Sequence, residues 1–169
     1  EVRVVAMPKQ NVQAVLELIK GLKKELVFIT IPSEALEFVF GKKGYITYDQ
    51  DENIMTVEIG HEATSMTIIS KGKVVLTRQI DFGALHVSLS VQEEAVDETV
   101  ASQINTHIIM EMERLLQFYK SNFSQVPLKM IYLLGGGSTL KGMRTSIHNV
   151  FKVPTEKISI LSKVEEAPH

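Results

Sequence analysis

Three consecutive glycines near the end of this sequence could bind a phosphate-bearing ligand through their main chain. Gly135, Gly136 and Gly137 follow the apolar segment Met130 to Leu134 and precede Ser138. Glycines at a strand-to-helix junction let the main chain approach a partner closely, and free N–H groups at a helix start attract anions. Ser138 is also suited to cap the following helix. The run is neither a dinucleotide fingerprint nor a P-loop, so a tight turn without ligand explains it equally well.

Composition removes several other kinds of chemistry. The 169 residues contain no cysteine, which excludes disulfides and thiolate metal sites. The five histidines show no metal-ligand spacing, and a net charge of −2 does not favour nucleic acid as a partner. No apolar run is long enough to span a bilayer. Because the chain opens on Glu1 and enters a β-type run at once, we expect it to be part of a longer protein.

The first forty residues predict a small β-α-β-α unit. Val2 to Ala6 and Glu25 to Ile31 are β-type apolar runs, and a helical pattern lies between them from about Gln10 to Leu22. Ser33 is placed to cap a short helix over Glu34 to Phe40. The glycines and lysines at 41–44 break both periodicities, so we predict domains over 1–43 and 44–169.

The remainder predicts a β-meander followed by alternating helices and strands. The meander consists of Ile54 to Ile59, Ser65 to Ile69 and Val74 to Ile80. The segments after it are a long helix from Gln92 to about Ser121, a strand over Met130 to Leu134, a helix from about Leu140 to Val150, and a short strand over Ile158 to Leu161. This order predicts an α/β, ribonuclease H-like fold with a mixed five-stranded sheet and flanking helices.

A nuclease on this fold would need carboxylates from the first strand, the long helix and the fourth strand to hold two divalent metals. Glu58 lies on the first strand, and Glu111 and Glu113 lie on the helix. The fourth strand, Met130 to Leu134, contains no acid. The sequence therefore disfavours metal-dependent nuclease activity.

The chain resembles the actin-like (ASKHA) proteins of type IV pilus and type II secretion assembly, the PilM- and FtsA-like family. The segments that carry the resemblance are Val57-Glu58-Ile59-Gly60 with Thr64, Lys73 to Gln79 leading into Ile80-Asp81-Phe82-Gly83, Glu111 to Tyr119, and Gly135 to Gly142. The resemblance implies an actin-like fold in which 1–43 is a partial first subdomain. It also implies two nucleotide-type turns, formed by Gly60 and Thr64 and by Gly135, Gly136, Gly137 and Ser138.

Departures from the family pattern indicate that these turns are vestigial. Where the family's first phosphate turn reads roughly Asp-Ile-Gly-x-Gly-Thr-Thr, this chain has Glu58, Glu62 and Ala63 in place of the aspartate, the second glycine and the first threonine. Glu62 would repel a polyphosphate, and Ala63 removes a hydroxyl donor. The family's other phosphate loop does not occur in the chain. This reduced form resembles the cytoplasmic domains of BfpC and GspL.

The resemblance therefore implies a scaffold rather than an enzyme, with no cofactor. It would act at the cytoplasmic face of a bacterial inner membrane, with a pilus or secretion assembly ATPase and a polytopic platform protein as partners. Membrane association would come from regions outside the chain, and homodimer formation is left open. The alternative is a fragment of an ATP-binding PilM- or FtsA-like protein that uses ATP and Mg²⁺. On the scaffold hypothesis, alanine at Gly136 should disturb folding more than any ATP-dependent activity.

Overall fold

The computed structural model describes residues 6, 8–41, 46, 48–49, 51–85, 98–123 and 125–158. The chain divides into two compact units, Glu1–Ile31 and Pro32–His169. The short helix that follows Ile31 thus packs within the second unit. The predicted boundary between residues 43 and 44 is a different one: it divides two subdomains of the actin-like family, and it remains a prediction.

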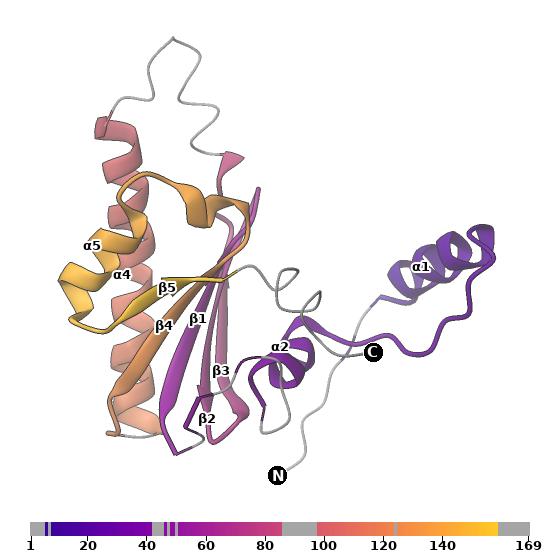
Figure 1. Cartoon of the computed structure of the whole chain (residues 1–169). Helices are drawn as coiled ribbons and strands as arrows, with labels where there is room; N and C mark the ends of the chain where they lie inside the picture. The colour runs from indigo at the N-terminus through magenta and orange to yellow at the C-terminus, as the bar shows by residue number, and fades with distance from the viewer. Residues whose placement is uncertain are drawn as a thin grey trace. The chain divides into compact units, whose positions relative to one another are not determined.

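The first unit contains one described helix, α1 (Lys9–Gly21), which confirms the helical pattern (Figure 1). It begins after Pro8 and ends at Gly21, and the N–H of the C-cap residue Leu22 donates to the carbonyl of Leu18 at 3.1 Å. The strand predicted over Glu25 to Ile31 is not found, because these residues form no ladder with any other described residue. A β-type run becomes a strand only when another strand accepts its hydrogen bonds, and the described part of this unit offers none. The run predicted at Val2 to Ala6 lies almost entirely outside the described residues.

The second unit is built on the mixed five-stranded sheet that the sequence predicts. Its strands are β1 (Asn53–Ile59), β2 (Thr64–Ser70), β3 (Lys73–Ile80), β4 (Leu128–Leu134) and β5 (Thr155–Lys157), in the order β3-β2-β1-β4-β5. β1, β2 and β3 are antiparallel neighbours, whereas β4 runs parallel to β1 and to β5. Lys71 and Gly72 both have positive φ (53° and 71°), as a two-residue hairpin turn between twisted strands requires.

Helices cover both faces of this sheet (Figure 1). α4 (Glu98–Asn122) and α5 (Met143–Phe151) pack on one face, where the buried core includes Val57, Ile108 and Leu133. α2 (Pro32–Phe40) packs on the other face, where Phe40 lies 5.1 Å from Tyr132 between ring centroids. No helix in the described part of the chain is both long and apolar enough to cross a membrane.

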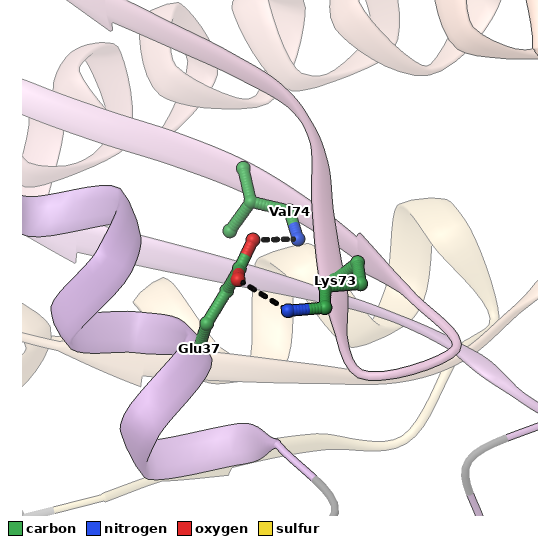
Figure 2. Close-up of polar contacts among 3 residues, drawn as sticks. All are labelled: Glu37, Lys73 and Val74. Atoms are coloured by element: carbon green, nitrogen blue, oxygen red, sulfur yellow. Dashed lines mark hydrogen bonds and ion pairs between the residues drawn. The ribbon is translucent and has the colours of Figure 1, made fainter. Parts of the chain in front are cut away.

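A single carboxylate fastens α2 to the hairpin between β2 and β3. One oxygen of Glu37 accepts the backbone N–H of Val74 at 2.9 Å, and the other accepts Lys73 Nζ at 3.1 Å (Figure 2). The Glu37 side chain is only 17% exposed, whereas that of Lys73 is 74% exposed. Since exposed ion pairs contribute little, the bond to the main-chain N–H of Val74 is the stronger part of this contact.

Both predicted serine caps are wrong. α2 begins at Pro32, so Ser33 lies inside its first turn, and proline is favoured at a first helical position because it has no N–H to satisfy. The glycine run enters a 3₁₀ turn, η1 (Gly136–Thr139), and the following helix α5 begins after Gly142 rather than at Leu140. The last strand among the described residues is β5, which ends just before Ile158, and residues 159–161 of the predicted strand Ile158 to Leu161 lie outside the described residues.

Candidate functional site

The two glycine-bearing turns meet at the carboxyl ends of β1 and β4. Glu58 and Leu134 are register partners on these parallel strands, so the glycine run leaves β4 directly beside Ile59. A Cβ on Gly135, whose φ is +79°, would lie 2.5 Å from the carbonyl oxygen of Ile59. A Cβ on Gly137 would overlap Cγ2 of the Ile59 side chain. Packing against Ile59 therefore explains two of the three glycines without any ligand.

Gly136 differs from its neighbours, which corrects the expectation from the sequence. No atom lies within 4 Å of a Cβ built at this position, and its φ is not in the left-handed region. Alanine at Gly136 therefore has no steric reason to disturb folding. The fold instead depends on Gly135 and Gly137.

The turn between β1 and β2 is closed by hydrogen bonds within the chain. The Gly60 N–H donates to the carbonyl of Ala63 at 2.9 Å, and the Gly60 carbonyl accepts the N–H of Ala84, also at 2.9 Å. The segment after β3 crosses so closely that a Cβ on Gly83 would lie 2.6 Å from the carbonyl oxygen of His61. The Gly60 N–H is thus already bonded, and it would have to exchange that partner to hold a phosphate.

Both hydroxyls that the sequence places in these turns also donate to main-chain carbonyls. Thr64 Oγ1 donates to Phe82 at 2.7 Å and is fully buried. Ser138 Oγ donates to Gly135 at 2.6 Å and is 6% exposed. A hydroxyl has one proton, so neither side chain has a donor left for a phosphate oxygen in this arrangement.

A hollow of about 760 Å³ lies beside the glycine turn. One wall is the apolar face of α2, and the other is formed by the turn and by the ends of β1, β4 and β5. Its lining residues are Pro32, Ala35, Leu36, Val39, Glu58, Leu134, Gly135, Gly136, Ser138, Thr139, Lys157 and Ile158. Ligands of open α/β sheets bind at this end of parallel strands, and the volume falls in the usual range of about 300–1,000 Å³.

The ionisable groups around the sheet are dispersed rather than gathered. Glu58 lines the hollow, whereas Glu111 pairs with Arg114 and, at 2.6 Å, with Arg78 of β3. No group of three or more metal-ligating side chains occurs among the described residues. In the core that α2 covers, burial raises the pKa of Tyr132, and the negative charges of Glu156 and Glu52 raise it further.

The sequence did not lead us to expect α2 in the lining of the hollow, because residues 1–43 were predicted to belong to the first subdomain. The signal was present, since Pro32, Ala35, Leu36 and Val39 follow the i, i+3, i+4, i+7 spacing of one helix face. Lys157 and Ile158 were missed as well. Their place in the hollow depends on how β5 pairs with β4, which spacing does not reveal.

Comparisons with known proteins agree with this architecture: the chain has the actin-like fold. It is similar to a chain of the PilM–PilN type IV pilus biogenesis complex, with a TM-score of 0.71 at 20% identity over 92% of this chain and 49% of that one. It is also similar to the ethanolamine utilization protein EutJ from Carboxydothermus hydrogenoformans, with a TM-score of 0.58 at 19% identity over 91% of this chain and 57% of that one. MreB5 of Spiroplasma citri bound to ADP gives a TM-score of 0.61 at 13% identity over 95% of this chain and 65% of that one.

The chain thus spans between about half and two thirds of the length of these solved proteins. No family model matches its sequence, and no curated protein does.

Proposed function

We propose that this chain is a non-catalytic scaffold module in the inner-membrane assembly platform of a bacterial type IV pilus, or of a type II secretion machine. Its proposed place is the cytoplasmic face of that membrane. The proposed partners are the assembly ATPase and a membrane protein of the platform. The likeness to PilM in a complex with PilN supports a role in pilus assembly, although the chain covers about half of that protein.

The observation that carries the non-catalytic part is the bonding of the two hydroxyls. The resemblance assigns Thr64 and Ser138 to nucleotide-type turns, and each of their hydroxyls donates its proton to a main-chain carbonyl. Glu62 is exposed in the same β1–β2 turn. At about 4 Å in water it would repel a phosphate charge by about 1 kcal/mol, and more where water is excluded. These residues do not fit a bound triphosphate.

A second candidate function is ATP binding with Mg²⁺, as in a PilM- or FtsA-like parent protein. The observation that favours it is the hollow beside the glycine turn, at the end of the sheet where open α/β proteins bind ligands. MreB5 of Spiroplasma citri, whose solved structure has a similar fold, is bound to ADP in that structure. This candidate requires the hydroxyls of Thr64 and Ser138 to exchange their present partners.

Two measurements on the same protein separate these functions. Co-purification of the 169-residue chain with the assembly ATPase and platform proteins of its own organism tests the scaffold. Titration with a fluorescent ATP analogue and Mg²⁺ tests the alternative. We expect stable co-purification that added ATP leaves unchanged, and no saturable nucleotide binding at micromolar concentration. Micromolar binding of nucleotide by this chain would overturn the non-catalytic proposal.

A further inference from the structure

A buried carboxylate holds two exposed guanidinium groups on the face of the sheet that α4 covers. Glu111 of α4 pairs with Arg114, one turn further along the same helix, and at 2.6 Å with Arg78 of β3. The Glu111 side chain is 7% exposed, whereas the side chains of Arg78 and Arg114 are 43% and 58% exposed. The negative charge of this cluster is therefore buried, and its two positive charges lie at the surface.

The cluster has one positive charge more than its own carboxylate neutralises. A guanidinium group has five N–H donors in a planar fork, and a bidentate contact with a carboxylate uses two of them. Arg78 and Arg114 therefore keep donors for a second carboxylate. Because Glu111 already orients both forks, a partner's carboxylate meets side chains whose ordering cost is partly met before binding.

The acids closest in sequence lie away from the two arginines. Glu113 follows Glu111 by two residues, which places it about 200° around α4, on the side away from β3. Asp81 lies beyond the end of β3, about 10 Å of extended chain from Arg78. Among the ion pairs of the described residues, no second acid contacts Arg78 or Arg114. The surface at these arginines is thus positive, although the whole chain has a net charge of −2.

An exposed aromatic pair continues this surface along α4. Phe118 follows Arg114 by four residues, so the two side chains are neighbours on the helix surface. Phe118 is 52% exposed, and its ring centroid lies 6.1 Å from that of Phe123, which is 53% exposed. Arginine and aromatic residues are the types enriched in protein interfaces. Since β3 is the edge strand of the sheet, no described strand lies beyond Arg78 to cover this surface.

We infer that the α4–β3 surface, formed by Arg78, Arg114, Phe118 and Phe123, binds a segment of a partner protein that carries glutamate or aspartate beside a large apolar side chain. The acid of the partner pairs with the two guanidinium groups, and its apolar side chain packs on Phe118. Charge complementarity selects an acidic occupant rather than a basic one. This inference rests on the proposed scaffold function and specifies the chemistry of one partner.

Three capped hexapeptides test the inference, each with a central Leu-Phe pair flanked on both sides by glutamate, glutamine or lysine. They are titrated into the 169-residue chain at low salt and followed by fluorescence polarisation and by amide NMR. We expect the glutamate peptide to bind about tenfold more tightly than the glutamine peptide, and the lysine peptide to bind most weakly. Non-specific attraction to a chain of net charge −2 would give the reverse order. Amide shifts should concentrate at Arg78, Arg114 and Phe118.

Variants separate recognition from a purely structural role of the cluster. Arg114→Gln leaves Glu111 paired with Arg78 but removes the surplus charge, so the glutamate peptide should bind no better than the glutamine peptide. Phe118→Ala should weaken all three peptides. Lys120→Gln is the matched control, because it removes the same charge from α4 about 240° around the helix from Arg114, and it should leave binding unchanged. Thermal unfolding followed by circular dichroism confirms that each variant is folded.

Four results would overturn the inference. The first three are equal binding of the glutamate and lysine peptides, no saturable binding of the glutamate peptide, and a folded Arg114→Gln variant that binds the glutamate peptide as the parent chain does. The last of these would leave the arginine with a structural role alone. The fourth is a dimer in sedimentation equilibrium that Arg114→Gln dissociates, which would assign the surface to a second copy of the chain.

The failure of this inference is distinguishable from failure of the scaffold function. If the peptides fail but the chain still co-purifies with assembly proteins, only the role of the α4–β3 surface is lost. If co-purification fails while the glutamate peptide binds as expected, the scaffold proposal falls and the acid-binding surface stands.

Discussion

Gly137 packs directly against the side chain of Ile59, with no room between them for a single added methyl group. This contact joins the two turns that sequence motifs mark as nucleotide-type. Gly135 and Gly137 are thus explained by the closeness of the 3₁₀ turn to the end of β1, whereas Gly136 is not. Which glycine matters for the fold is a question of packing, and it can be tested residue by residue.

We predict that Gly137→Ala lowers the free energy of unfolding by about 1–3 kcal/mol, the usual cost of overpacking a core. Gly136→Ala should change it by no more than about 0.5 kcal/mol, because its Cβ enters open space. Urea denaturation followed by far-UV circular dichroism measures both. Gly136→Ala is the matched control, since the same methyl is added one residue away.

The partner residue tests the cause of the Gly137 effect. If overlap with Ile59 is responsible, the double variant Ile59→Ala with Gly137→Ala should be less destabilised than the sum of the two single variants. Strict additivity would contradict the packing explanation. Equal destabilisation by Gly136→Ala and Gly137→Ala would contradict it as well.

Glu37 gives a second prediction, on the attachment of α2 to the sheet. Glu37→Ala leaves the Val74 N–H without this acceptor and should cost about 1.5–3 kcal/mol, the range for hydrogen bonds to charged groups. Lys73→Ala removes only a largely exposed ion-pair partner and should cost less than about 1 kcal/mol. Hydrogen exchange at the Val74 amide should accelerate in the first variant and not in the second. Equal losses of stability in both variants would show that the ion pair, and not the main-chain bond, holds the helix.

The sheet was predictable from the sequence because its strands carry their own pattern and turn signals, such as Lys71-Gly72 between β2 and β3. Features that depend on contacts between distant parts of the chain were harder to predict from the sequence. Residues 25–31 have the composition of a strand, but a strand also depends on a neighbour that composition does not specify. Ser138 has the type and position of a helix cap, yet its hydroxyl bonds to Gly135 inside the turn.

The hollow was unpredictable for a related reason. Its volume depends on where the first turn of α2 lies above the ends of β1 and β4, and that is a result of tertiary packing. The motif residues showed where a ligand site could be. Their hydrogen-bond partners, which decide whether Thr64 and Ser138 could serve a phosphate, became visible only in the folded chain.

A third prediction concerns Thr64. Thr64→Val keeps the shape of the side chain but removes the proton donated to the Phe82 carbonyl, so the free energy of unfolding should fall by about 0.5–1.5 kcal/mol. Nucleotide titrations of the variant and the parent chain should be indistinguishable, because this hydroxyl has an internal partner. Weaker nucleotide binding at unchanged stability would instead assign the hydroxyl to a phosphate. Thr139→Val, which removes an exposed hydroxyl from the glycine turn, is the matched control for stability.

The last prediction concerns stability at alkaline pH. Burial beneath α2, reinforced by the charges of Glu156 and Glu52, raises the pKa of Tyr132 above its ordinary value of 10. The folded state therefore holds the phenol proton more tightly than the unfolded state. The stability from this group is complete below the unfolded pKa and is lost as the pH rises through the folded pKa.

Tyr132→Phe should accordingly flatten the fall in stability above pH 10, as measured by urea denaturation at closely spaced pH values. Because burial also raises the pKa of Tyr48, the double variant with Tyr48→Phe should flatten the curve further. The phenyl ring of Tyr132→Phe keeps the contact with Phe40, so stability at neutral pH should change by less than about 1 kcal/mol. An alkaline loss of stability that is equally steep in the parent chain and in both variants would place the responsible group elsewhere.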